Sequence, residues 1–206
     1  MFAGKPIIGL AGGIGSGKST VAELLGEMRC LVLSADEHVR DAYRDPAVVA
    51  RLRQWWGDSI ADPSGELDRK AVARIVFENS EEKKRLENLV HPIVAVKRNE
   101  AMRAAADDAQ VLAYVWDIPL LFEVGLADQC DVIVFVDAPF EQRLERVKST
   151  RGWDERELLR REKLQVPLDI KRQMSNYILK NTADVGFARR QVQDVLSTIL
   201  TRRSGR

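Results

Sequence analysis

One stretch near the N-terminus, GGIGSGKS at residues 12–19, constrains this chain more than any other part of it. It fits the pattern G-x-x-x-x-G-K-[ST], in which glycines let the backbone curl so that its N–H groups point inward around phosphate oxygens. An apolar run at residues 6–11 precedes it as an expected strand, and residues 20–28 follow as an expected amphipathic helix. In this context the motif predicts a nucleoside triphosphate site at the N-terminus of a helix.

Each residue of this loop has an expected part in holding a nucleotide. The ammonium group of Lys18 can reach the β- and γ-phosphates, and the hydroxyl of Ser19 can hold Mg²⁺. The predicted ATP-binding residues of the loop are Gly13, Ile14, Gly15, Ser16, Gly17, Lys18, Ser19 and Thr20.

Composition places the chain among ordinary globular enzymes. Its 206 residues are enough for one domain with inserted lobes. The 32 basic and 31 acidic residues leave a formal net charge of +1, so we expect no nucleic acid partner. Its two cysteines form neither a metal motif nor a disulfide framework, which indicates a reducing compartment. The sequence has no signal-peptide pattern and no apolar run of membrane-spanning length, so we expect a cytoplasmic protein without a membrane partner.

Apolar segments alternate with helical patterns along the chain, which is typical of a parallel sheet covered by helices on both faces. The sequence therefore predicts the α/β class and the three-layer fold of P-loop NTPases, with a parallel five-stranded sheet. The expected strands are residues 6–11, 30–34, 111–116, 132–136 and 177–179, and a closing helix is expected over 185–200.

Two segments interrupt this alternation within what we expect to be a single P-loop domain, residues 1–206. Residues 36–108 form a predicted helical insertion, whose longest helix, residues 81–106, should kink or restart at Pro92. Residues 141–174 are strongly charged and arginine-rich, typical either of a solvated helical face or of a mobile lid that closes on phosphates. The expected core is then residues 1–35, 109–140 and 175–200.

Carboxylates follow two of the expected strands. Asp36 comes after the second strand, where the carboxyl ends of parallel strands open onto the binding crevice. It could orient or deprotonate an attacking hydroxyl, or it could cap a helix that begins near Glu37. Asp117 ends the third apolar run and could belong to a magnesium shell or cap a turn. His91 precedes Pro92 and could be either structural or functional.

Several motifs, taken in order, resemble the bacterial dephospho-CoA kinase family over about residues 7–196. The sequence GGIGSGKS is much more specific than the general loop pattern. Ser34-Ala35-Asp36 occupies the position of the family's D-A-D motif. The later matches are GELDR at residues 65–69, IVF at 75–77, LVHPI at 89–93 and DIPLLFE at 117–123. Their order and spacing make the resemblance specific.

The resemblance implies a kinase that transfers the γ-phosphate of ATP to the 3′-hydroxyl of dephospho-CoA, forming coenzyme A and ADP. It implies Asp36 as the group that orients or deprotonates this hydroxyl, with Lys18 and the lid residue Arg146 as further catalytic residues. ATP and Mg²⁺ are the implied ligands, and Ser19 and Asp117 are the implied residues of the Mg²⁺ site. The implied acceptor-binding residues are Asp36, Asp68, Arg69, His91, Pro119 and Leu120.

Two positions depart from the family pattern. The family's A-D-x-x-I-x-N near the last strand is SNYILKN at residues 175–181, so that Asn176 replaces the aspartate while Asn181 is kept. Arg151 lies one place beyond the family's second lid arginine. We expect Asn181 on the adenine side of ATP and Arg151 on its phosphates. The expected partners are these small molecules, and the chain is expected to be a monomer or a weak homo-oligomer.

Two other functions stay open at this point. A nucleoside or nucleotide kinase would share the loop and the lid, but the long helical insertion favours a larger acceptor. A nucleotide-dependent binding module would hold ATP without transferring its phosphate. Loss of ATP that depends on an acceptor would distinguish a kinase from such a module.

Overall fold

The computed structural model describes residues 1–182 and 184–203. It divides the chain into two compact units: unit 1, made of Met1–Ser34 and Ala104–Arg206, and unit 2, made of Ala35–Arg103. Each unit is described by itself below.

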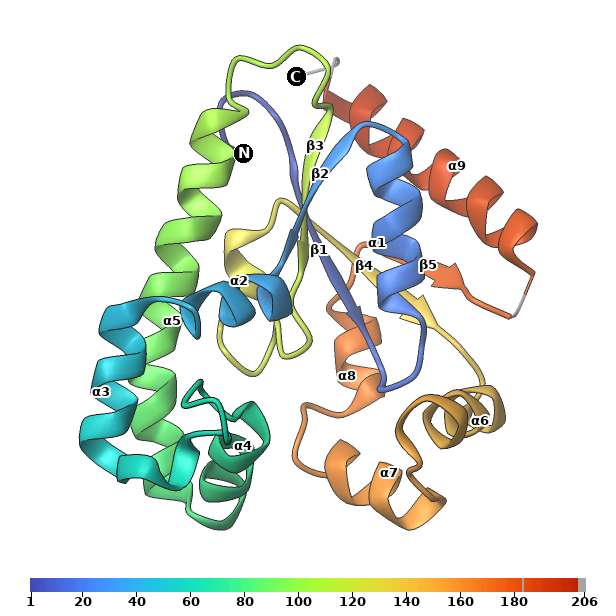
Figure 1. Cartoon of the computed structure of the whole chain (residues 1–206). Coiled ribbons are helices and arrows are strands. Elements are labelled where there is room, and N and C mark those ends of the chain that lie inside the picture. Colours follow the sequence, from blue (N-terminus) through green and yellow to red (C-terminus); the bar gives the residue numbers. More distant parts are fainter. Residues whose placement is uncertain (183, 204–206) are drawn as a thin grey trace. The chain divides into compact units, whose positions relative to one another are not determined.

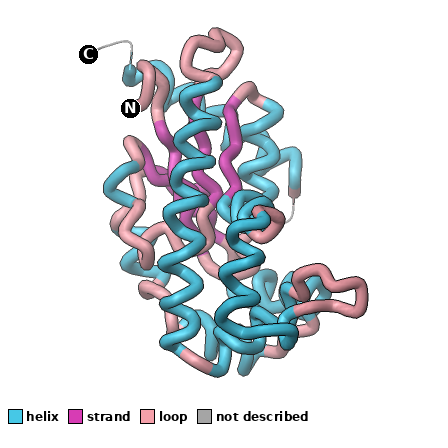
Figure 2. The backbone as a smooth tube through the Cα atoms, turned by 60° about the vertical axis from the view of Figure 1, so that its left-hand side comes forward, coloured by secondary structure: helices cyan, strands magenta, loops and turns pink. Residues whose placement is uncertain are grey.

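Unit 1 is built on five parallel strands in the order β2-β3-β1-β4-β5 (Figure 1; magenta in Figure 2). The parallel five-stranded sheet expected from the sequence is confirmed. The third strand begins two residues later than expected, because the N–H of Val111 donates to the carbonyl of Asp108 in a turn instead of joining the sheet. The strands are β1 Ile7–Gly12, β2 Cys30–Ser34, β3 Ala113–Asp117, β4 Val132–Asp137 and β5 Tyr177–Lys180.

Two helices cover one face of this sheet: α1 (Lys18–Glu27) and α9 (Val185–Arg203). Their apolar side chains share one core with alternate strand residues such as Val115 and Val134. Because side chains alternate across a strand, the intervening residues point to the opposite face, where Phe135 is also buried. The near-continuous burial of the strands thus reflects a sheet covered on both faces.

Three helices of unit 1 form the segment predicted to be a lid: α6 (Phe140–Arg151), α7 (Glu155–Glu162) and α8 (Leu168–Gln173). The first ends at Gly152, whose φ of 66° is the left-handed conformation that glycine adopts readily. The second begins at Asp154, whose carboxylate accepts a hydrogen bond from the N–H of Glu157 at 2.8 Å. The sharp turn between α6 and α7 is therefore encoded locally. A short 3₁₀ helix, η2 (Ala127–Gln129), precedes β4.

Unit 2 consists of helices around a core of its own. Its long helix runs through Pro92 without a break, so the expectation that a new helix could begin there is wrong. Val48, Leu52 and Ile60 are among the residues that form its buried centre. The elements are α2 (Ala35–Ala42), α3 (Pro46–Trp56), the 3₁₀ helix η1 (Gly57–Ile60), α4 (Arg69–Glu78) and α5 (Ser80–Ala104).

Within the part of the chain that the structure describes, no helix combines the length and the apolar character that crossing a membrane requires.

Candidate active site

The phosphate-binding motif lies between β1 and α1. Gly17 has a φ of 88° and directly precedes Lys18, the first residue of α1. No side chain in the described part of the chain caps this helix end, so the first backbone N–H groups of α1 remain available to an anion. A Cβ atom at Gly17 would lie 2.0 Å from Nδ2 of Asn181, which shows how closely the loop is packed. The loop therefore fits the phosphate chain of a nucleotide in conformation as well as in sequence.

Lys18 occupies the charged centre of this loop. Its Nζ donates to the carbonyls of Gly12 and Gly13 at 3.1 and 3.2 Å. Burial lowers the pKa of Lys18 to about 8, an effect that the carboxylate of Asp117 partly offsets. Lys171 and Arg151 lower the pKa further, and Glu123 raises it. The structure thus brings the predicted residues Lys18, Asp117 and Arg151 into one electrostatic environment.

Arg146 and Asn181 hold the loop backbone. Nη1 of Arg146 donates to the carbonyls of Gly15 and Ser16, both at 3.2 Å, and Nη2 donates to the carbonyl of Asn181 at 3.2 Å. Nδ2 of the buried Asn181 donates to the carbonyl of Ser16 at 2.8 Å. Both residues were expected to contact ATP, and in this structure both fix the loop that would bind it.

A second arginine of α6 has a role that sequence reasoning missed. Arg143 is 6% exposed, and its Nη1 donates to the carbonyl of Ile14 at 3.3 Å while pairing with Glu162 of α7. A Cβ atom at Gly13 would lie 2.7 Å from this Nη1, so a larger residue there would displace the guanidinium from its present position. The sequence showed Arg143 only as one charge among many in the segment.

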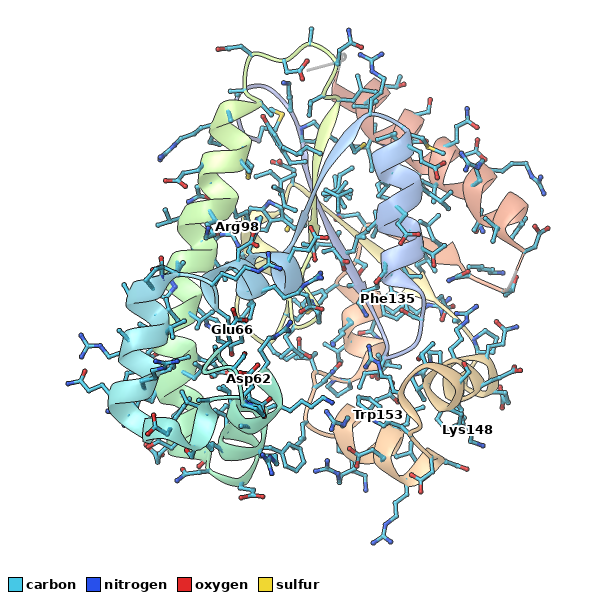
Figure 3. All side chains as sticks on the ribbon, in the orientation of Figure 1. Asp62, Glu66, Arg98, Phe135, Lys148 and Trp153 are labelled. Carbon is cyan, nitrogen blue, oxygen red and sulfur yellow. The ribbon has the colours of Figure 1, made fainter. Side chains whose placement is uncertain are left out.

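Arg151 ends α6, and its guanidinium lies 4.8 Å from the ring centre of Trp153 (labelled in Figure 3). The guanidinium of Arg161 lies 4.0 Å from the same ring centre. Such cation–π contacts restrict where a long, flexible arginine side chain can reach. Trp153 therefore anchors the predicted phosphate contact Arg151.

A buried ion pair next to this site also escaped the sequence analysis. Nζ of Lys171, on α8, lies 2.7 Å from Oε1 of Glu123, and only 2% of the lysine side chain is exposed. Nζ also donates to Oε1 of Gln165 at 3.1 Å, while the N–H of Val166 donates to Oε1 of Glu123 at 2.9 Å. The pair ties the end of the predicted lid to the segment after β3. Nothing in the local sequence indicates that these two charges meet.

The two residues expected near a metal lie at the ends of their elements. Asp117 is the last residue of β3 and is in register with Ser34 of β2. Ser19 is exposed in the first turn of α1. The described residues contain no group of three or more histidine, cysteine or acidic side chains that could bind a metal.

Unit 2 holds most of the predicted acceptor-binding residues. Asp36 is exposed in the first turn of α2, which begins at Ala35, so the alternative that Asp36 caps this helix is wrong. α2 begins two residues before the start near Glu37 that the sequence allowed. Asp68 does cap a helix: its carboxylate accepts a hydrogen bond from the N–H of Lys70 at 2.8 Å at the start of α4.

The remaining predicted acceptor residues are spread over both units. Arg69 starts α4, and its guanidinium lies 5.9 Å from the ring centre of Tyr43. His91 is exposed on α5. Pro119 and Leu120 belong to unit 1, in the turn after β3. Asp36, Asp68, Arg69 and His91 thus share unit 2, while Pro119 and Leu120 share unit 1 with the phosphate-binding loop.

Comparison with known proteins identifies relatives along nearly the whole chain. A family model described as dephospho-CoA kinase matches residues 6–186. A dephospho-CoA kinase of Corynebacterium efficiens is 37% identical over 197 residues, which cover 95% of this chain and 98% of the relative. Among solved structures, a dephospho-CoA kinase from Campylobacter jejuni is similar with a TM-score of 0.69 and 25% identity, covering 96% of this chain and 98% of that one.

A shikimate kinase from Acinetobacter baumannii shares the fold at a TM-score of 0.51 and 20% identity, covering 96% of this chain and 94% of that one.

Proposed function

The chain belongs to the dephospho-CoA kinase family, and from this premise we propose how its residues transfer the γ-phosphate of ATP to the 3′-hydroxyl of dephospho-CoA. The observation that carries the assignment of residues is the loop at 12–19, with its uncapped helix start and its buried, charged surroundings. Phosphoryl transfer depends mainly on positioning and electrostatic stabilisation, so the roles below concern charge and orientation.

The loop and the N-terminus of α1 bind the phosphates of ATP. Backbone N–H groups from Gly13 to Thr20 surround them, and the ammonium of Lys18 neutralises charge on the transferring group. Arg151 reaches the phosphates from the lid, supported by its position near Lys18. Arg146 either stays on the loop carbonyls and stabilises the loop, or leaves them to contact a phosphate when the lid closes. Asn181 holds the loop in position on the side where the adenine binds.

Mg²⁺ accompanies ATP in this proposal. An exposed hydroxyl at Ser19 and a carboxylate at Asp117 suit an ion that prefers oxygen ligands and keeps several of its waters. The electrostatic effect of Asp117 on Lys18 supports its place beside the loop. When bound, the ion supplies positive charge that offsets the charge of the phosphates.

Asp36 orients or deprotonates the 3′-hydroxyl of the acceptor. Its carboxylate is exposed and serves no capping role, which supports a function outside the helix. The other residues proposed to contact the acceptor are Arg69, His91, Pro119 and Leu120. Asp68 contributes by capping the helix that presents Arg69.

We place this reaction in the cytoplasm, a reducing compartment that suits the buried free thiol of Cys30. The net charge of +1 favours small molecules as the only partners. In this proposal the chain works as a monomer or a weak homo-oligomer. Elution in size-exclusion chromatography over a range of protein concentrations measures that state.

An assay of ADP release tests the function. The protein is supplied with ATP, Mg²⁺ and either dephospho-CoA or a panel of nucleosides and nucleoside monophosphates. We expect turnover with dephospho-CoA and a product heavier by one phosphoryl group at the 3′ position. Turnover only with the panel would contradict the acceptor, and ATP binding without turnover would contradict the activity.

A further inference from the structure

The ion pair between Arg143 of α6 and Glu162 of α7 is buried beside the phosphate-binding loop. Only 7% of the arginine side chain and 15% of the glutamate side chain are exposed. A Cβ atom at Gly13 would lie 2.7 Å from Nη1 of Arg143 and 3.2 Å from Oε1 of Glu162, so both charges lie against the start of the loop. A carboxylate of the predicted lid thus reaches the loop that would hold phosphates.

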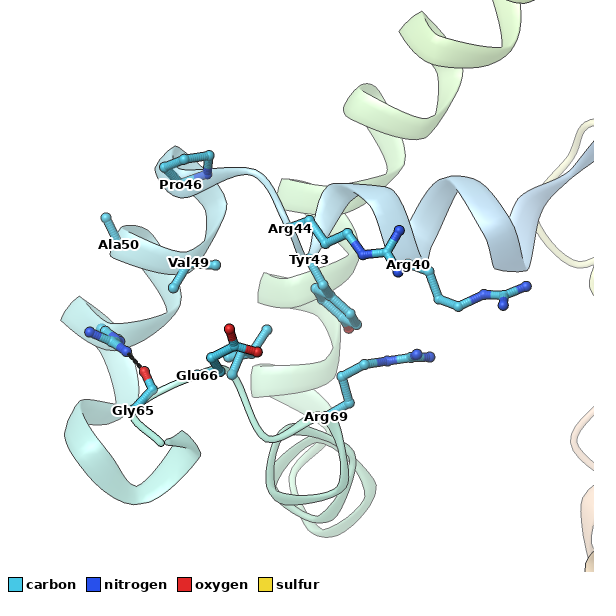
Figure 4. A pocket seen from close by; sticks show the side chains of 11 residues that line it. Arg40, Tyr43, Arg44, Pro46, Val49, Ala50, Gly65, Glu66 and Arg69 are labelled. Atoms are coloured by element: carbon cyan, nitrogen blue, oxygen red, sulfur yellow. Dashed lines mark hydrogen bonds between the residues drawn. The ribbon is translucent and has the colours of Figure 1, made fainter. Parts of the chain in front are cut away.

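Burial distinguishes this pair from the exposed ion pairs of the chain. Arg44 of unit 2 lines a cavity and extends away from α2 (Figure 4), and it pairs with Asp41 at 3.3 Å with both side chains exposed. Exposed pairs of this kind hold their helices weakly, because water competes for both charges. A buried charge that loses its partner stays desolvated, so separating Arg143 from Glu162 is costly.

The arginine of this pair is fixed to the loop. Nη1 of Arg143 donates to the carbonyl of Ile14 at 3.3 Å. The backbones are also packed closely, because a Cβ atom at Gly15 would lie 2.7 Å from the carbonyl oxygen of Arg143. Arg146, one turn further along α6, donates to the carbonyls of Gly15 and Ser16. The loop and α6 therefore form one base, to which Glu162 attaches α7.

The glutamate of the pair belongs to the helix that supports Arg151. Arg161 precedes Glu162 on α7, and its guanidinium lies 4.0 Å from the ring centre of Trp153. The guanidinium of Arg151 lies 4.8 Å from the same ring centre. Among the eight residues of α7 only Leu158 is buried, so apolar packing alone fixes this helix weakly. The position of the Trp153 ring and of Arg151 therefore depends on the ion pair.

We propose that Glu162 is a positioning residue, which holds α7 against the loop so that Arg151 meets the phosphates of ATP. Its pair with Arg143 is the fixed point, and the ring of Trp153 links α7 to Arg151. Arg151 is close enough to Lys18 to affect it electrostatically, so these contacts begin and end at the loop. The inference rests on the proposed function, because it takes Arg151 as a phosphate contact. A charge stabilises the transferring group only where it is held in position, so Glu162 acts on the rate through Arg151.

A double-mutant cycle tests this role. Glu162→Gln keeps the shape of the side chain and removes its charge, and we expect kcat to fall about 10- to 100-fold. In the Arg151→Met background the same change should lower kcat by no more than about 2-fold, because the residue through which it acts is already absent. A purely structural role would lower kcat by the same factor in both backgrounds.

Glu145→Gln is the matched control, since it removes the same charge from an exposed position on α6. It should leave kcat unchanged. Circular dichroism and thermal unfolding show whether the variants fold. Glu162→Asp takes the place of Glu162→Gln if the latter does not fold, because it keeps the charge beside Arg143 and withdraws it by one methylene group. Its smaller fall in kcat should likewise be absent in the Arg151→Met background.

An equal fall in kcat in both backgrounds, or no fall in a folded Glu162→Gln variant, would overturn the role of Glu162. A wild-type kcat in Arg151→Met alone would overturn it as well, because Arg151 would then not act on the phosphates. The proposed function is tested separately, by turnover of dephospho-CoA in the wild-type protein. If the protein turns over only the panel of nucleosides and nucleoside monophosphates, the cycle is run with that acceptor and still tests Glu162.

Discussion

The ammonium group of Lys18 lies in surroundings that favour its neutral form. Burial lowers its pKa to about 8, so in the ligand-free protein it loses its proton as the pH rises through that value. A neutral amine attracts phosphate far less. We therefore expect kcat/KM for ATP, which reports the free enzyme, to fall above about pH 8. The profile of kcat should fall at a higher pH, because bound phosphates stabilise the protonated form.

Lys18→Arg is the control for this profile, since a guanidinium stays charged throughout the range. Its residual activity should show no fall near pH 8. A wild-type profile that is flat to pH 10 would contradict the role of Lys18.

Asp36→Asn separates catalysis from stability. The amide keeps the shape of the carboxylate but is neither charged nor basic. We expect kcat to fall about 10²- to 10⁴-fold if Asp36 acts as a base, with the KM for ATP unchanged. The free energy of unfolding should fall by no more than about 1 kcal/mol, because Asp36 is exposed and contributes only its charge near the start of α2.

Rate measurements and denaturant titrations on the same preparation check both expectations. A loss of stability without a loss of rate would assign Asp36 to the helix alone.

Elements defined by local patterns could be predicted, and contacts between distant segments could not. The apolar run of β4 and the glycines before α1 are readable from a few neighbouring residues. Lys171 looked like one more charge on a solvated face, yet the fold buries it against Glu123 from another part of the chain. The sequence allowed a helix start near Glu37 with Asp36 as its cap, whereas α2 begins at Ala35 and includes Asp36. The spacing of apolar residues does not fix the residue at which a helix begins.

For the ion pair between α8 and the segment after β3, removing one charge should lower the free energy of unfolding more than replacing both charged residues with apolar ones. Lys171→Met alone leaves the Glu123 carboxylate buried without its cation, and we expect a loss of about 3–5 kcal/mol in the free energy of unfolding. The double variant Glu123→Leu, Lys171→Met removes both charges and should recover most of that loss. Urea denaturation of the single and double variants measures the difference.

Additive losses in that cycle would show that the two side chains do not depend on each other. If the double variant regains stability but not activity, the pair also positions the lid end for the reaction.

On the scale of the whole molecule, the proposed functions are divided between two units with separate cores. The phosphate-binding loop and the charges around Lys18 belong to unit 1, while Asp36 and Arg69 belong to unit 2. Changes at Arg69 or His91 should therefore alter the KM for the acceptor alone, and changes in the loop should alter the KM for ATP. Because of this division, steady-state kinetics can assign the effect of each substitution to one of the two substrates.

Binding of ATP should raise the unfolding temperature of the whole chain. A ligand at 100 times its Kd stabilises the folded state by about 2.7 kcal/mol. For a protein of this size that is a rise of roughly 5–11 °C. We expect most of the rise to require Mg²⁺, so that chelation with EDTA reduces it at the same ATP concentration. Lys18→Met should show little rise under either condition, and Asp117→Asn should lose the magnesium-dependent part. An equal rise with and without EDTA would contradict the proposed metal at Ser19 and Asp117, while leaving the phosphate-binding loop in place.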